Sequence, residues 1–131
     1  MTPNKNILLY SPPSHNAGIR LQGIISTVVS WENLTIIQNI ESLFHILRQP
    51  QNKVAVSIIL ASGETDMKDL ISIRDLLHRN SIILILPDQE KQTITMGHVL
   101  RPRYLSYTNS DFSDVRDVLK KIVGKLDVSV N

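Results

Sequence analysis

Val54-Ala55-Val56-Ser57-Ile58-Ile59-Leu60 is an almost continuous apolar run, and Ile82-Ile83-Leu84-Ile85-Leu86 is a second one further along the chain. Runs that do not alternate with polar residues are typical of parallel strands that are covered on both faces of a sheet. Shorter runs rich in Ile, Leu and Tyr occupy 7–10, 34–37 and 104–107. Together they predict five strands, each a short run bounded by polar or turn residues.

The segments between these runs carry apolar residues at helical spacing. They predict helices around 24–28, 43–47, 70–77, 92–100 and 112–126. The last helix is the clearest, because Asp111 and Asp114 fall in its first turn and Ser110 or Asn109 can cap it. Residues 127–131 are expected to be a frayed tail. The order β-α, repeated, predicts an α/β fold: a five-stranded doubly wound parallel sheet with helices on both faces, a three-layer sandwich.

Length and composition limit the class of protein. The 131 residues suffice for one domain, 1–131, with its core at about 6–126. A net charge of +2 and short basic clusters give no stripe that could follow a phosphate backbone, so nucleic acid is not an expected partner. Disulfides and thiolate chemistry are excluded because there are no cysteines. The sequence has no signal-peptide core and no apolar stretch of membrane-spanning length, so the expected location is the cytoplasm.

The predicted strands end in residues with little chemical reactivity. These ends are Ser11-Pro12-Pro13, Ala61-Ser62-Gly63, Leu86-Pro87 and Tyr107-Thr108. Ligands and catalysis collect at the carboxyl edge of an open α/β sheet, yet this edge offers neither a carboxylate nor a lysine. The sequence therefore predicts a binding module without a cofactor, not an enzyme.

The element order resembles the receiver domain of bacterial response regulators, a flavodoxin-like fold, from Asn6 to Leu126. Glu41-Ser42-Leu43 is similar to that family's Glu-Ala-Leu, and Tyr104-Leu105-Ser106-Tyr107 resembles its Tyr-Leu-x-Lys, with Tyr104 at the switch aromatic. The resemblance lies in pattern more than in identity. It implies a signalling role within a two-component system.

The residues that the family uses for phosphorylation are replaced here. In the family, an acidic pair after the first strand holds Mg²⁺ and an aspartate after the third accepts the phosphoryl group. A Thr or Ser after the fourth strand and a Lys after the fifth bind its oxygens. The matching positions are Ser11 and Pro12, Ser62 (or Ala61), Leu86 (or Pro87), and Tyr107. Since Mg²⁺ requires carboxylate oxygens, the resemblance implies a degenerate pseudo-receiver that is not phosphorylated. Glu64, Asp66 and Asp88, close in sequence, are expected to be solvated loop residues.

Two other sites remain open. The loop 11–18 lies where flavodoxin-like proteins hold phosphate at a helix N-terminus, so a small-molecule, phosphate-binding or phosphoryl-carrier domain, with His15 as carrier, is the alternative. His45, His78 and His98 are at unrelated spacings and predict no metal site. Trp31 is expected to cover the edge of the core, with an interface anchor as the alternative.

The expected partner is a protein, including a second copy of the chain. It would bind the surface formed by the helix at 92–100, the strand at 104–107 and the helix at 112–126, where arginines and a tyrosine supply typical interface chemistry. The candidate interface residues are Gln92, Met96, Arg101, Arg103, Tyr104, Arg116 and Lys120.

Overall fold

The computed structural model describes residues 6–13, 16–50 and 52–130. A parallel sheet of five strands, ordered β2-β1-β3-β4-β5, forms the middle layer. The strands are β1 (Asn6–Tyr10), β2 (Leu34–Ile37), β3 (Val54–Leu60), β4 (Ser81–Leu86) and β5 (Tyr104–Tyr107). Each strand lies within one residue of the predicted run, and the sheet has the predicted doubly wound order.

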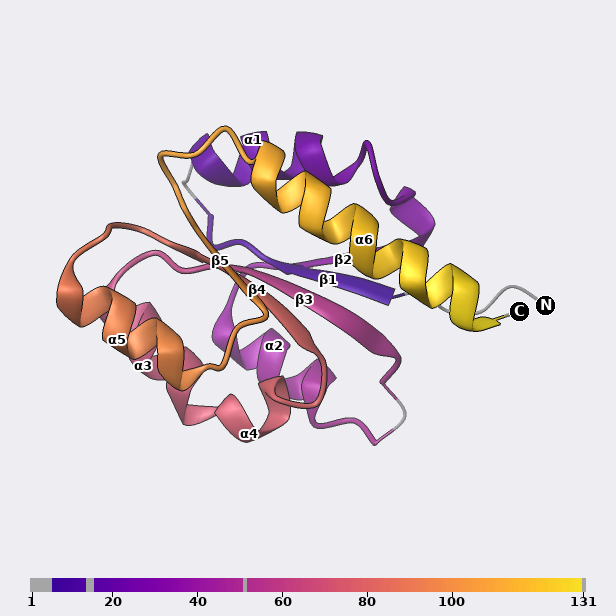
Figure 1. The fold of residues 1–131 in the computed structure, drawn as a ribbon. Helices are drawn as coiled ribbons and strands as arrows, with labels where there is room; N and C mark the ends of the chain where they lie inside the picture. Colours follow the sequence, from indigo (N-terminus) through magenta and orange to yellow (C-terminus); the bar gives the residue numbers. More distant parts are fainter. Residues whose placement is uncertain (1–5, 14–15, 51, 131) are drawn as a thin grey trace.

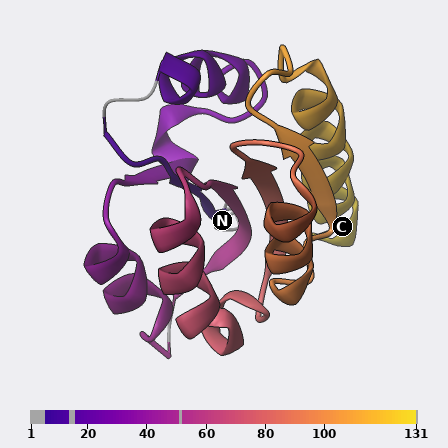
Figure 2. The same ribbon diagram turned by 90° about the vertical axis from the view of Figure 1, so that its left-hand side faces the viewer.

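Helices cover both faces of this sheet (Figure 1). On one face lie α1 (Asn16–Ile25) and α6 (Ser113–Val130); on the other lie α2 (Ile40–Leu47), α3 (Glu64–Ser72), α4 (Arg74–Leu77) and α5 (Lys91–Val99). A short 3-10 helix, η1 (Trp31–Asn33), leads into β2. The strands end at the left of Figure 1, where α1 and α5 begin, and Figure 2 is viewed from that side.

The core is divided by the sheet into two apolar clusters, since successive residues of a strand face opposite sides. Ile58 and Leu60 of β3 face α1 and α6, whereas Ile59 and Ala61 face the helices of the other layer. All four side chains are fully buried. This explains the continuous apolar runs: both alternating sets of side chains on a central strand lie in a core.

The predicted helix at 70–77 is broken into α3 and α4. Ile73 has a φ of −112° and a ψ of 21°, outside helical values. The hydroxyl of Ser72 donates to the carbonyl of Asp69, and a serine hydroxyl that bonds the backbone in this way competes with the helical pattern. Apolar spacing continues across the break because Leu70, Ile73 and Leu77 are all buried.

Two expectations about the last helix are wrong. It begins at Ser113, after Phe112, and continues to Val130 where a frayed tail was expected. Phe112 is fully buried but precedes the helix with a φ of 65°. The cap is also different, because Asp111, not Ser110 or Asn109, accepts the backbone N–H of Ser113.

Trp31 does not cover the edge of the core. Its side chain is 62% exposed on η1, so the expectation of a core-covering role is wrong. The short 3-10 turn that precedes β2 directs the ring outward, and Leu34 and Ile36 pack against the core instead.

Candidate functional site: the carboxyl edge of the sheet

The strand register brings the ends of the strands together. Tyr10 is paired with Ile37 of β2 and Ile59 of β3, and Leu86 is paired with Tyr107 of β5. The residues predicted to replace a phosphorylation site therefore meet at one edge, which faces the viewer in Figure 2.

Most of these residues are buried or partly buried, and they leave few reactive groups at the edge. Ser11 is 5% exposed, and its backbone N–H donates to the carbonyl of Ile37. Leu86 is fully buried, and Tyr107 is partly buried against the same apolar cluster. Of the residues that follow β3, Ala61 is fully buried and Ser62 is exposed. Neither Ala61 nor Ser62 carries a carboxylate.

A tyrosine side chain spans the space between β1 and α3. The Tyr10 hydroxyl donates to Oδ1 of Asp66 at 2.6 Å, and the Tyr10 side chain is 3% exposed. Burial is the largest cause, and the hydrogen bond to Asp66 the second, of a pKa of the Tyr10 phenol far above its usual value. The phenol is therefore neutral over the whole physiological pH range.

The second carboxylate oxygen of Asp66 also accepts hydrogen bonds. Its Oδ2 accepts the backbone N–H of Ser62 at 2.9 Å and the Ser62 hydroxyl at 3.2 Å. The expectation that Asp66 is a solvated loop residue is wrong, because it lies in the first turn of α3 and organises the loop after β3. Glu64 and Asp88 are exposed, as expected: Glu64 contacts Lys68 at 3.6 Å, and Asp88 accepts the N–H of Glu90.

The loop between β5 and α6 is held by a residue of α1. Arg20 donates to the carbonyls of Thr108 at 2.9 Å and Ser110 at 3.0 Å. Its guanidinium also lies 4.9 Å from the centroid of the Phe112 ring. A planar guanidinium can stack on an aromatic ring and donate in its own plane at the same time. Arg20 thus fixes the segment that follows the position where a receiver carries its lysine.

Asp114 is a second carboxylate that accepts several hydrogen bonds, and it lies beside this loop. It accepts hydrogen bonds from the hydroxyls of Tyr104, Ser106 and Ser110 at 2.8 to 2.9 Å. Burial alone would raise the pKa of Asp114, but the hydroxyl donors outweigh it and the pKa lies below its usual value. The sequence shows that Tyr104 and Ser106 are two residues apart on one face of a strand, but it does not show their shared acceptor on α6.

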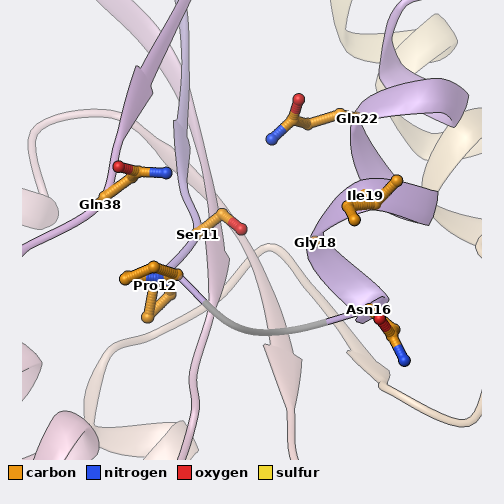
Figure 3. Close-up of a pocket in the computed structure, with 8 residues that line it drawn as sticks. Ser11, Pro12, Asn16, Gly18, Ile19, Gln22 and Gln38 are labelled. Carbon is orange, nitrogen blue, oxygen red and sulfur yellow. The ribbon is translucent and has the colours of Figure 1, made fainter.

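A shallow cavity of about 220 Å³ lies between β1, β2 and α1 (Figure 3). Its polar side chains include Ser11, Gln22 and Gln38, and the two amides extend into it from opposite sides. Gly18 lets α1 approach closely, because a Cβ at this position would collide with the Ser11 hydroxyl oxygen. None of the described residues that line the cavity has a cationic side chain. His15, the expected carrier histidine, lies outside the described residues.

The described residues contain no group of three His, Cys, Asp or Glu side chains that could hold a metal ion. His45 is exposed on α2, and His98 is exposed near the end of α5. In the same part of the chain, no helix has both the length and the apolar character that crossing a membrane requires.

The candidate interface residues divide into two groups. Gln92, Arg101 and Arg103 are exposed on and just after α5, and Met96 packs partly against the core on the α3 side. Tyr104 is half-buried on β5, with its hydroxyl on Asp114.

Arg116 and Lys120 are not beside Tyr104. At 100° per residue, they lie about 160° and 120° around α6 from Asp114, which faces β5. Neither residue is therefore on the side of α6 that faces β5. The structure therefore brings together the candidates on α5 and β5 and separates the two on α6.

No protein-family model and no curated protein sequence matches the chain. Several solved structures do match the chain. The chain is similar to the signal receiver domain of an HD domain-containing protein from Pseudomonas fluorescens Pf-5, with a TM-score of 0.73 and 14% identity over 98% of this chain and 94% of that one. The response regulator RcsB of Salmonella typhimurium gives 0.64 and 14%, covering 94% of this chain and 62% of RcsB. The receiver domain of NarL from Mycobacterium tuberculosis gives 0.59 and 11%, covering 93% and 99%. At these identities the likeness confirms the predicted fold, a receiver-like α/β sandwich.

Proposed function

We propose that the chain is a pseudo-receiver: a non-catalytic signalling module that is not phosphorylated on aspartate and acts by binding another protein. The fold of signal receiver domains supports the signalling role. Fold likeness alone is a weak warrant for function, so the proposal depends on the site.

The observation that carries the proposal is the closed carboxyl edge. The Tyr10 phenol spans from β1 to Asp66, and Asp66 is bonded at both oxygens. Phosphoryl transfer needs an acceptor carboxylate with cations that offset the developing charge. At this edge a neutral phenol takes the space, and the guanidinium of Arg20, which holds the loop after β5, is bonded to backbone carbonyls.

The residues do not fit the Mg²⁺ ion that the fold family implies. Mg²⁺ takes oxygen ligands in near-octahedral geometry, with one or two carboxylates among them. Tyr10, Ser11 and Pro12 end β1 where an acidic pair would be needed. No step of the proposed function therefore passes through a metal ion.

The test is a titration with Mg²⁺ and beryllofluoride, followed by amide chemical shifts. We expect no saturable shift at Ser11, Ser62 or Leu86. A receiver domain with an intact aspartate, titrated in parallel, shows that the reagent is active. Saturable shifts centred on those three residues would overturn the proposal.

The proposed protein-binding surface is the α5-β5-α6 side, in particular Arg101, Arg103 and Tyr104. The two arginines are exposed beside a half-buried aromatic ring, a combination enriched at protein interfaces. Because the Tyr104 hydroxyl is held by Asp114, the ring is presented in one orientation. A preordered ring loses less conformational entropy on binding.

Alanine variants compare this surface with the strand edge. We expect Tyr104→Ala to weaken association by about 1 to 3 kcal/mol and Ser62→Ala to have almost no effect. Arg103→Ala, at an exposed position, gives the same comparison without altering the core. Sedimentation and pull-down measurements rank the variants, and the reverse ranking would move the functional site to the strand edge.

The cavity beside α1 supports a second candidate, a small-molecule domain that uses the 11–18 loop. Its hydrogen-bonding groups, Ser11, Gln22 and Gln38, suit a neutral polar ligand better than phosphate, since the described lining residues carry no cation. Inorganic phosphate is therefore expected to give no saturable shift at Gln22 or Gln38. Saturation there would favour a phosphate-binding domain and would contradict the preference for a neutral ligand.

A further inference from the structure

Three polar side chains face the cavity between β1, β2 and α1 and leave their hydrogen-bonding groups unused. They are the hydroxyl of Ser11 and the carboxamides of Gln22 and Gln38. None of the three forms a hydrogen bond with another residue in the described part of the chain (Figure 3). Buried or concave polar groups in proteins usually have a partner, so these three are available to a ligand.

Ser11 is the most deeply buried of the three. It is 5% exposed, and its backbone N–H donates to the carbonyl of Ile37 at 2.8 Å, which fixes it beside the end of β2. Tyr10 faces the layer of α2 and α3, so Ser11, the next residue, faces α1. Gly18 of α1 has no side chain that would collide with the Ser11 hydroxyl. Two hydrogen-bonded strands therefore hold a buried hydroxyl at the base of the cavity.

The two glutamines lie on opposite walls of the cavity. Gln38 directly follows β2, and Gln22 is on α1. Their carboxamides extend into the space between them (Figure 3). A carboxamide carries a donor and an acceptor side by side and has no charge. It can form two parallel hydrogen bonds with another amide-type edge, as glutamine does with adenine.

The rest of the lining disfavours a charged ligand. Every described residue around the cavity has an uncharged side chain. A charged group that leaves water without an opposite charge beside it loses much free energy of hydration. Ile19 at the rim is 72% exposed, and Pro12 lies below it in the lining. These two residues offer apolar surface that a neutral ligand could cover.

We propose that the cavity binds an uncharged ligand through an amide group of that ligand, a carboxamide or a cyclic amide. Gln22 and Gln38 hold the amide from two sides, and the Ser11 hydroxyl gives a third hydrogen bond. This ligand class rests on the second candidate function, the small-molecule domain, which it makes specific.

Three probes of the same shape and different charge test the ligand class. Benzamide is neutral, benzoate is an anion and benzamidine is a cation at neutral pH. Benzamide should give saturable shifts of the side-chain amide signals of Gln22 and Gln38, with a dissociation constant of about 1 to 10 mM, typical of so small a ligand. The two ions should bind at least about tenfold more weakly. Added salt should leave the affinity for benzamide unchanged, because no charge pair is involved.

Exchanging an amide for a carboxylate should reverse the selectivity. Gln22→Glu should weaken benzamide binding about tenfold, because the benzamide carbonyl loses its donor. The same variant should tighten benzamidine binding about tenfold, because a carboxylate accepts both parallel N–H groups of an amidinium. Gln38→Glu should act in the same direction. Gln49→Glu makes the same change at an exposed position after α2 and should alter neither affinity. A variant that gains affinity for one probe cannot simply have failed to fold.

Three results would overturn the proposed ligand class: no saturable shift with benzamide, binding of benzoate as tight as that of benzamide, or an unchanged ranking of the probes in both glutamine variants. Each of them would leave the pseudo-receiver proposal standing, since that proposal is tested separately by beryllofluoride at the closed strand edge.

Discussion

Replacing Tyr10 by Phe removes one hydroxyl from the closed strand edge and keeps the ring. In the structure the hydroxyl donates to Asp66 at 2.6 Å from a side chain that is 3% exposed. A hydrogen bond to a charged group contributes about 1.5 to 3 kcal/mol. Since Asp66 is only half-buried, water can replace the lost donor, so we expect a loss near the lower end, about 1.5 kcal/mol. Urea unfolding at neutral pH measures it.

A double-mutant cycle separates this hydrogen bond from packing. In an Asp66→Ala background, Tyr10→Phe should cost little, which gives a coupling of about 1 kcal/mol or more. Tyr107→Phe is the matched control. Among the described residues the tyrosine hydroxyls that donate belong to Tyr10 and Tyr104, so the control should change stability by less than about 0.5 kcal/mol.

Tyr10→Phe should also alter the stability of the fold at alkaline pH. The pKa of Tyr10 is raised in the folded chain, so its contribution is complete below the unfolded value of 10.0 and is lost as the pH rises above it. Tyr10→Phe should remove that part of the alkaline loss. A stability change below about 0.5 kcal/mol, or no coupling to Asp66, would refute the argument that the phenol closes the edge.

Three further predictions concern other parts of the fold. Ile59→Ala removes a fully buried side chain from the central strand, and we expect it to cost about 2 to 5 kcal/mol in urea unfolding; a change below roughly 0.5 kcal/mol would place the strand at the surface. Asp114→Asn should make the stability of the fold less dependent on pH in the acid range. The pKa of Asp114 is lowered in the folded chain, so its carboxylate stabilises the fold at pH values above its pKa in the unfolded chain, and this stabilisation is lost as the pH falls through its pKa in the folded chain. An unchanged acid dependence would contradict this. Arg20→Lys keeps the charge but not the planar donor pair, so amide exchange at Thr108 and Ser110 should accelerate, and unchanged rates would mean that the clamp is not formed in solution.

The strands could be predicted from the sequence because burial on both faces leaves a direct signature. The runs 34–37, 54–60 and 104–107 match β2, β3 and β5 at both ends. Helix ends were less accurate. The break at Ile73 and the start of α6 depend on local bonds of Ser72 and Asp111, which compete with helical spacing without changing the apolar pattern.

The site could be predicted only as an absence of reactive residues. The sequence shows that the residues at the strand ends lack carboxylates. That these residues meet at one edge follows from the parallel arrangement of the strands. What replaces the missing chemistry depends on contacts between distant segments. Tyr10 and Asp66 are 56 residues apart, and no local pattern marks them as partners.

Arg20 also bears on how the chain folds during synthesis. Its two acceptor carbonyls lie 88 and 90 residues later in the sequence. A ribosome adds about 5 to 20 residues per second, so several seconds separate the synthesis of α1 from that of the loop it holds. During that interval the guanidinium has no native acceptor, and the face of the sheet that receives α6 is uncovered. A chaperone that binds exposed apolar strands would therefore meet this domain at its α1 face, before residues 108–112 emerge.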